Sequence, residues 1–287
     1  MDDKGAIPIR KEKSMKRSVF KRIAAMTLAG LMAMSLSACS GGGSSDGLAA
    51  IKERGVLKVG VKADVPKFSL QKTDGSGYEG FEDDLAYEIA GRIFDMTGEE
   101  AKAEDKVEFQ AVNAKTRGPL VENGEVDCVI ATFTITPERK ETYNFSPAYY
   151  TDAVGLLVLK DSGIKDVEDL DGKIIGVAQS STSQAEFEKY KEENGVKATP
   201  TFQEFATYPE LAQALAAKQI DVFSVDGAIL AGYVNDTNEL LDVRYGEQEY
   251  GICSNKENEE LSELINTTVQ EMLDDGSMDA LLEKWGL

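Results

Sequence analysis

Histidine is absent from this sequence of 287 residues. Its absence excludes His-based catalytic triads and imidazole metal ligands, and it makes hydrolase mechanisms poor candidates. Cysteine is scarce too: Cys39, Cys128 and Cys253 have no C-x-x-C spacing and carry no zinc or redox signature. We expect Cys128 and Cys253 to be small buried residues. No spacing of Asp, Glu or Lys suggests an acid/base pair, so the sequence predicts no cofactor, no metal and no enzyme.

Positive charge is also in short supply. The chain has 31 basic and 51 acidic residues, a net charge of −20. Residues 1–38 hold eight basic and three acidic side chains, which leaves 23 basic against 48 acidic residues, or −25, for the remainder. Such a surface repels nucleic acid, so we expect no nucleic-acid partner. A small anionic ligand would need a local cationic pocket set against this background.

Long apolar runs are almost missing. Residues 23–36 form an apolar stretch too short for a confident membrane span, and four basic residues precede it between positions 16 and 22. The stretch ends in LSAC (residues 36–39), which resembles a bacterial lipobox and implies a lipidated Cys39. We predict a signal peptide over residues 1–38, with Met15 as an alternative start, and a flexible linker over residues 39–47. A short transmembrane anchor is the alternative.

The most informative stretch is VDCVIATFTITPERK (residues 126–140). Residues 126–131 are β-branched and apolar, which is typical of a buried strand. Thr132 and Thr134 follow it, and Thr136-Pro137 predicts a helix start that leads to Arg139. The carboxyl edge of a sheet is where small ligands bind in open α/β folds. A capped helix with a solvated arginine is an equally good interpretation of this stretch alone.

The order strand, polar turn, helix, strand occurs in both halves of the chain. GVLKVGV (residues 55–61) is echoed by GKIIGV (residues 172–177), and VDCV (residues 126–129) by IDVF (residues 220–223). This predicts two similar α/β lobes. A helix with apolar residues four apart is expected over residues 81–93.

Residues 126–140 also resemble the central motif of the family 3 extracellular solute-binding proteins, the amino-acid receptors of ABC importers. VNAKTRGPL (residues 112–120) is most similar to the aspartate/glutamate receptors of the cell-binding-factor type. The resemblance covers nearly the whole mature chain. It implies a two-lobed α/β periplasmic-binding-protein fold of type II, with a discontinuous first lobe and a two-strand hinge near residues 150–154 and 244–250. Residues 48–150 and 250–287 would form lobe 1, and residues 151–249 lobe 2 with the hinge segments.

The resemblance also implies roles for individual residues. Arg139 would pair with the ligand's α-carboxylate, helped by backbone N–H groups at the start of a helix. Asp226 and the Thr134 hydroxyl would take the ammonium; Asp226 could instead be only an N-cap. The residues placed in the ligand site on this basis are Thr132, Thr134, Arg139, Thr182, Ser183 and Asp226.

Specificity is expected to rest on Arg117 and Lys62. By resemblance, Arg117 would hold the ligand's side-chain carboxylate and Lys62 would add a second cation; from the residues alone, a solvated Arg117 and a structural Lys62 are favoured. Phe68 would lie against the ligand or belong to the core. With aspartate bound, three cations would face two carboxylates, one ammonium and Asp226, which leaves the site near +1.

We therefore expect a substrate-binding lipoprotein of an ABC importer. It would be exported, held by lipidated Cys39 on the periplasmic or cell-surface side of a membrane, and monomeric. Its lobes would close on aspartate or glutamate before it docks on an ABC permease. The alternatives are a receptor for glutamine or another polar amino acid, a dehydratase-like enzyme on the same fold, and a surface adhesin.

Overall fold

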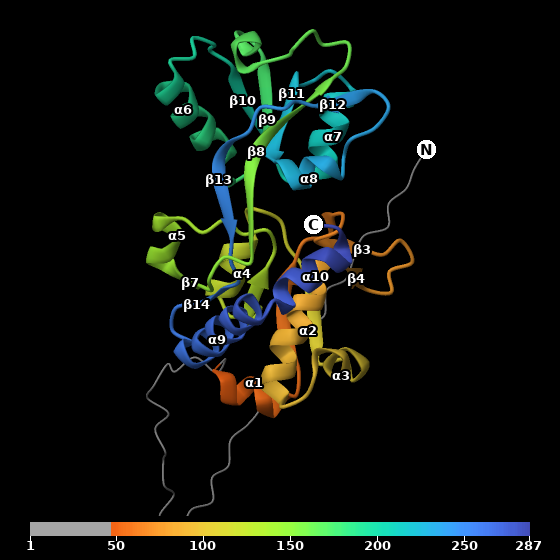
Figure 1. Ribbon diagram of the computed structural model, residues 1–287, viewed down its shortest axis with the longest axis vertical. Helices are drawn as coiled ribbons and strands as arrows, with labels where there is room; N and C mark the ends of the chain where they lie inside the picture. The colour runs from red at the N-terminus through yellow and green to blue at the C-terminus, as the bar shows by residue number, and fades with distance from the viewer. Residues whose placement is uncertain (1–46) are drawn as a thin grey trace, which may run out of the picture. The chain divides into compact units, whose positions relative to one another are not determined.

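The computed structural model describes residues 47–287, so the predictions for Cys39, the signal peptide and the lipid anchor lie outside the described residues. Residues 47–287 belong to one compact unit. Within it, two β-sheets with helices packed against them form two lobes (Figure 1). No helix in this range is long and apolar enough to span a membrane.

The first lobe is built on a five-stranded sheet with the order β5-β1-β6-β14-β7. β1 is parallel to β5 and β6, whereas β14 is antiparallel to β6 and β7. β14 follows the whole second lobe in the sequence, which makes the first lobe discontinuous, as predicted. The strands are β1 (Leu57–Val61), β5 (Val107–Ala111), β6 (Cys128–Ile130), β7 (Tyr143–Phe145) and β14 (Cys253–Asn255).

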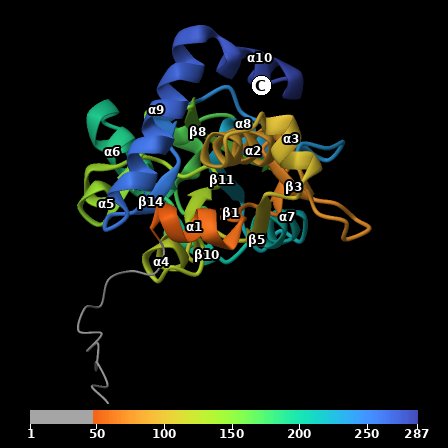
Figure 2. The same cartoon turned by 90° about the horizontal axis from the view of Figure 1, so that it is seen from below.

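The helix α2 (Phe81–Phe94) supplies much of the core of the first lobe. Its predicted apolar stripe is confirmed, because Phe81, Leu85, Ile89 and Ile93 are all buried. α2 is flanked by α3, α9 and α10 (Figure 2). The remaining elements of the lobe are α1 (Leu48–Arg54), α3 (Gly98–Ala103), α4 (Arg117–Glu122), α5 (Pro137–Thr142), α9 (Glu259–Asp275), α10 (Ser277–Trp285), and a small sheet of β2 (Asp64–Val65), β3 (Ser69–Gln71) and β4 (Tyr78–Glu79).

The second lobe is built on a sheet with the order β10-β9-β11-β8-β12. β9 is parallel to β10 and β11, so the carboxyl ends of these three strands share one edge. The strands are β8 (Tyr150–Leu159), β9 (Ile174–Ala178), β10 (Thr201–Phe205), β11 (Val222–Asp226) and β12 (Asn238–Leu240). The helices are η1 (Val167–Leu170, a 3₁₀ turn), α6 (Ser183–Asn194), α7 (Tyr208–Ala216) and α8 (Gly227–Ala231).

Two strands connect the lobes. β13 (Tyr245–Tyr250) runs antiparallel to the first half of β8, with Tyr250 opposite Tyr150 and Tyr245 opposite Val154. They form the predicted two-strand hinge (Figure 1). The predicted lobe boundaries, after residues 150 and 249, fall at the first-lobe ends of these strands, and their positions stay a prediction.

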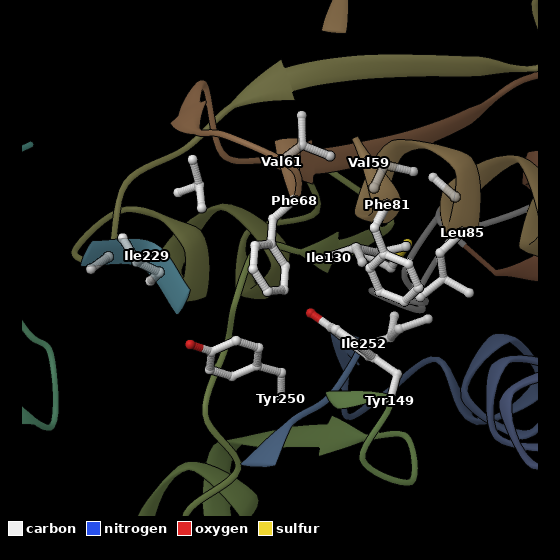
Figure 3. Packing of buried hydrophobic residues seen from close by; sticks show 14 of the residues in the cluster. Val59, Val61, Phe68, Phe81, Leu85, Ile130, Tyr149, Ile229, Tyr250 and Ile252 are labelled. Atoms are coloured by element: carbon white, nitrogen blue, oxygen red, sulfur yellow. The ribbon is translucent and has the colours of Figure 1, made fainter. Parts of the chain in front are cut away.

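An aromatic cluster packs the first lobe against the hinge. The ring of Phe68 lies 5.2 Å from that of Tyr150 and 6.0 Å from that of Tyr250, centroid to centroid. Phe81 contacts both Phe68 and Tyr149, so the cluster is continuous with the α2 stripe (Figure 3). The hinge is therefore anchored by large rings on its first-lobe side.

The strand predicted over residues 126–131 is shorter than expected. β6 covers only Cys128–Ile130, because Thr132 has a φ of +46° and turns the chain away from the sheet. The predicted helix start is confirmed: the Thr136 hydroxyl accepts the N–H of Arg139 at 3.2 Å, and Pro137 begins α5. Cys128 and Cys253 are both buried, as expected, and neither forms a disulfide.

Candidate functional site

Several charged residues lie at the carboxyl ends of the first-lobe strands. Lys62 follows β1, and Thr132 follows the neighbouring parallel strand β6, so both reach the same edge of the sheet. Arg117, the first residue of α4, and Glu82, on α2, approach this edge from the helices. All four are buried, which for the three charged side chains, Lys62, Arg117 and Glu82, is rare outside binding sites and ion pairs.

Arg117 is only 3% exposed, so the solvated-arginine interpretation is wrong. Its Nη1 donates to the carbonyl oxygens of Ala131 at 2.7 Å and Thr132 at 2.8 Å, and its guanidinium lies 4.1 Å from the centre of the Phe133 ring. Its Nε has no hydrogen-bond partner, and Arg117 forms no ion pair, among residues 47–287. Arg117 is thus fixed in place by neutral groups, with its Nε–H unused.

Arg139 lies against the same aromatic ring. Its guanidinium is 4.7 Å from the centre of Phe133, and its Nη1 donates to the Thr134 carbonyl at 2.6 Å. Its Nη2 donates to the carbonyl of Ser180 at 3.1 Å, which joins α5 of the first lobe to the second lobe. Burial, together with the charge of Arg117, lowers the pKa of Arg139 to about 9. Its positive charge is therefore poorly compensated within the described part of the chain.

Lys62 is 1% exposed and lies at the boundary between the lobes. Its Nζ is 3.5 Å from Asp64 Oδ1 and 4.2 Å from the centre of the Tyr208 ring, which belongs to α7 of the second lobe. Burial lowers the pKa of Lys62 to about 8, and the nearby Arg117 lowers it further while Asp64 raises it. Two more bonds join the lobes here, from Tyr208 N to Asp64 Oδ2 at 3.2 Å and from the Tyr233 hydroxyl to the Asp64 carbonyl at 2.6 Å.

Glu82 is a site residue that the sequence analysis missed. Its side chain is fully buried, and its Oε1 accepts the Thr132 N–H at 2.6 Å and the Tyr149 hydroxyl. Both backbone polar groups of Thr132 are therefore held, the N–H by Glu82 and the carbonyl by Arg117, which stabilises its left-handed φ. Locally, Glu82 looks like an acidic residue at a helix N-terminus, so only tertiary structure places it here.

Asp226 ends β11 in the second lobe and is 5% exposed. Asp226 stands at the N-cap position of α8, but its side chain makes no capping hydrogen bond there. Its Oδ2 instead accepts the hydroxyl of Tyr250 from the hinge, so Asp226 is more than an N-cap. Burial raises the pKa of Asp226 to about 6, while Arg117 and Arg139 act to lower it. Asp226 is thus an acidic partner on the lobe opposite the two arginines.

A second missed residue, Gln248, links both lobes through the hinge strand β13. Its Oε1 accepts the hydroxyl of Thr134 at 2.8 Å and the hydroxyl of Thr182 at 2.6 Å. Thr182 occupies the N-cap position of α6, but its side chain makes no capping hydrogen bond there. Ser183, the first residue of α6, is buried, and its place in the ligand site stays a prediction.

Phe68 belongs to the core rather than to the charged cluster. It is fully buried and contacts the rings of Tyr150 and Tyr250. Because Tyr250 donates to Asp226, Phe68 supports that carboxylate through one intermediate ring (Figure 3). The core alternative for Phe68 is therefore the one that the structure favours.

The predicted charge of the site is wrong. Asp226 was predicted to be the only acidic residue facing the three cations, but Asp64 and Glu82 lie in the same cluster. Three carboxylates therefore face Lys62, Arg117 and Arg139, and the site is neutral when all are ionised. The residues that the structure brings together are Lys62, Asp64, Glu82, Arg117, Thr132, Thr134, Arg139, Asp226 and Gln248.

Comparison with known proteins adds independent findings. Residues 57–287 match the family described as bacterial extracellular solute-binding proteins, family 3. The chain is 35% identical over 279 residues to the ABC transporter glutamine-binding protein GlnH of Bacillus subtilis (strain 168), covering 92% of this chain and 97% of that protein. It is 32% identical over 276 residues to the glutamate-binding protein GluB of Corynebacterium efficiens, covering 93% and 91%.

Solved structures share the fold. The solute receptor for L-cysteine of Neisseria gonorrhoeae has a TM-score of 0.73 and 29% identity, covering 84% of this chain and 94% of that one. An ancestral amino-acid-binding protein described as a precursor of cyclohexadienyl dehydratase has a TM-score of 0.67 and 30% identity, covering 83% and 98%. The predicted two-lobed type II fold is confirmed by such structures.

Proposed function

Because the chain belongs to the family 3 bacterial extracellular solute-binding proteins, we propose that it is the substrate-binding protein of an ABC importer and that it holds an acidic L-amino acid between its lobes. The ligand is aspartate or glutamate. The lobes meet at the charged cluster described above, and each lobe supplies charges to it.

One observation carries the proposal. Arg117 and Arg139 lie against the same Phe133 ring, and neither forms an ion pair among residues 47–287. A planar guanidinium binds a carboxylate through two parallel hydrogen bonds, and a desolvated cation without a counter-charge is costly. Two such guanidiniums match a ligand with two carboxylates, which is the chemistry of an acidic amino acid.

The α-carboxylate belongs at Arg139. Its guanidinium spans the two lobes through the carbonyls of Thr134 and Ser180, next to the start of α6. The backbone N–H groups of Thr182 and Ser183 at that helix start add donors for the same carboxylate. A ligand held here contacts both lobes at once and therefore stabilises their closed arrangement.

The ammonium belongs at Asp226. Burial raises the pKa of this carboxyl to about 6, which means that its ionised form lacks sufficient counter-charge among residues 47–287. A ligand ammonium supplies that charge, and the Thr134 hydroxyl adds an acceptor oxygen.

The ligand's side-chain carboxylate belongs at Arg117 and Lys62. Arg117 has an unused Nε, and the pKa of Lys62 is lowered to about 8 by burial, so both cations gain from an added anion. Asp64 compensates only Lys62 and sits 3.5 Å away. The side-chain carboxylate thus finds two cationic donors in the first lobe.

Glutamine is the second candidate, and a specific observation favours it. Glu82 and Asp64 already neutralise two of the three cations, so a ligand without net charge also leaves the site balanced. The relative named for glutamine binding agrees with this candidate, and the relative named for glutamate binding agrees with the first.

The test is calorimetric titration of residues 47–287 with the common L-amino acids, together with Arg117→Ala. We expect aspartate or glutamate to bind most tightly, and the variant to lose those ligands while it keeps weak binding of neutral ones. Arg92→Ala is the matched control, because Arg92 is an exposed arginine of the same lobe paired with Glu271. If the wild type binds glutamine more tightly than aspartate or glutamate, the acidic ligand is wrong and glutamine takes its place.

The remaining parts of the proposal concern the setting of the protein. The chain is exported and anchored through lipidated Cys39, acts as a monomer, and delivers its ligand to an ABC permease. It binds its ligand without converting it. Recovery of the titrated amino acid unchanged after long incubation tests this last point, and a new product would support the dehydratase-like alternative.

A further inference from the structure

Glu82 has one carboxylate oxygen in use and one that is not. Oε1 accepts both the Thr132 N–H at 2.6 Å and the Tyr149 hydroxyl, whereas Oε2 has no hydrogen-bond partner among residues 47–287. The side chain is fully buried. A buried carboxylate oxygen without a partner is costly, and it indicates either a proton on that oxygen or a donor supplied by a ligand.

The neighbours of Glu82 are the same cations that are assigned to the ligand's side chain. Arg117, on α4, and Lys62, after β1, both act to lower its pKa, as does the Tyr149 hydroxyl, while burial is the largest effect and raises it to about 7. On α2 itself, the adjacent Asp83 is also an acid, and it faces Ser69 at 2.8 Å. Glu82 therefore shares Arg117 and Lys62 with whatever anion binds there.

The charges of the site decide what must happen when that anion arrives. Lys62, Arg117 and Arg139 oppose Asp64, Glu82 and Asp226, so the ionised site is neutral. An acidic amino acid carries one net negative charge, which leaves the buried cluster at −1 unless one carboxylate takes a proton. Glu82 is the candidate, because it is fully buried and has a bare oxygen.

We propose that Glu82 selects the ligand's side chain and that an acidic amino acid binds with the uptake of one proton, from solvent, onto Glu82 Oε2. The inference rests on the proposed function. Protonated Glu82 donates from Oε2 to the ligand's side-chain carboxylate. Ionised Glu82 accepts instead from the side-chain amide of glutamine. The same residue thus serves either ligand, and its protonation state determines which one is favoured.

The inference predicts different pH dependences for the two ligands. Glu82 has a pKa of about 7, so it is about half ionised at pH 7 and mostly ionised by pH 8 in the free protein. Binding of glutamate therefore takes up an increasing share of a proton from solvent, and its affinity falls by up to about tenfold per pH unit. Glutamine binds the ionised form of Glu82, so its affinity does not fall but rises, by up to about twofold, as Glu82 loses its remaining proton over the same range. Lys62, whose pKa is lowered to about 8, adds to the loss of glutamate binding as the pH approaches that value, so affinities are compared at or below pH 7.5.

The first experiment uses wild-type residues 47–287. Calorimetric titrations at pH 7.5, in phosphate and in Tris, give the number of protons taken up from the dependence of the binding heat on the ionisation heat of the buffer. We expect glutamate or aspartate to bind with an uptake of more than half a proton, and glutamine with almost none. Binding of the acidic ligand without proton uptake overturns this inference but leaves the proposed function standing. Failure of every amino acid to bind overturns both.

The second experiment compares Glu82→Gln with Glu88→Gln, a control on a half-buried glutamate of the same helix. In Glu82→Gln the amide oxygen keeps the bonds from Thr132 and Tyr149, and the amide N–H₂ imitates the protonated acid. At pH 7.5 we expect acidic ligands to bind about fourfold tighter than to wild type, and glutamine at least tenfold weaker. Proton uptake disappears in this variant and persists in the control. If the variant does not unfold cooperatively, the wild-type measurement decides alone; unchanged relative affinities in a folded variant overturn the inference.

Discussion

Replacing Asp226 by Asn removes one negative charge from the site and leaves the shape of the side chain almost unchanged. The carboxylate is buried, and the Tyr250 hydroxyl donates to its Oδ2. An amide oxygen accepts the same bond, so the hinge contact survives the substitution. The pKa of Asp226 is raised to about 6 by burial, so the variant also removes a poorly compensated charge at neutral pH. We therefore expect a folded protein that is at least as stable as wild type.

Binding should suffer much more than stability. A hydrogen bond to a charged group contributes about 1.5–3 kcal/mol, and breaking a buried ion pair costs about 3–5 kcal/mol. Since about 1.4 kcal/mol corresponds to a factor of ten, we expect the affinity for glutamate to fall by roughly 10²–10³. The loss is specific to the ammonium, because Asp226 is the acidic group that the second lobe presents to it.

Glutarate isolates that contribution, because it has both carboxylates of glutamate and no ammonium. Calorimetry should show wild type strongly preferring glutamate to glutarate, and Asp226→Asn with little preference. Asp221→Asn is the matched control, since Asp221 lies just before the same strand and accepts the Ile174 N–H at 2.8 Å, away from the site. An equal loss for both ligands, or none for glutamate, would refute the assignment of the ammonium to Asp226.

Three further predictions concern Lys62, Gln248 and Asp83. Lys62→Met removes a cation that is 3.5 Å from Asp64 Oδ1, and it should weaken glutamate binding roughly 10- to 100-fold in calorimetry while glutamine binding changes less. Gln248→Ala leaves the Thr134 and Thr182 hydroxyls without their shared acceptor, and urea unfolding should show a loss of about 1–3 kcal/mol. Burial raises the pKa of Asp83 to about 8, so the folded state holds a proton that the unfolded state releases. The free energy of unfolding should therefore fall as the pH rises from about 4 to 8. Asp83→Asn should remove part of this fall.

Matched variants separate these effects from general damage. Lys58→Met changes a lysine within β1 rather than after it, and should leave the ligand preference unaltered. Gln270→Ala removes an exposed glutamine of α9 and should cost little stability. Asp74→Asn changes an exposed aspartate and should keep the wild-type pH dependence of unfolding. A prediction fails if its control variant shows the same change as the variant to which it is matched.

Much of the fold follows from local patterns. The spacing of Phe81, Leu85 and Ile89 predicts a helix that the structure contains as α2, and Thr136-Pro137 predicts the start of α5. In both cases the determining interactions lie within a few residues of the chain. The two lobes and their hinge needed more than local patterns: they were predicted from the echo between the halves and from the family resemblance.

The acidic side of the site could not be predicted in the same way. Glu82, Asp83 and Asp84 look like three solvated acids that favour a helix N-terminus. Their burial depends on Thr132, Ser69 and Lys102, which lie 50, 14 and 18 residues away. A local sequence pattern contains no information about contacts between residues so far apart in the chain. The charge of the site was predicted wrongly because Glu82 and Asp64 were left out of it.

The most direct test of the central claim is a crystal structure of residues 47–287 with L-glutamate bound. The account predicts the ligand between the lobes, with its α-carboxylate on Arg139, its ammonium on Asp226 and its side-chain carboxylate on Arg117 and Lys62. A ligand bound elsewhere, or one whose side chain makes no contact with Arg117 and Lys62, would contradict it.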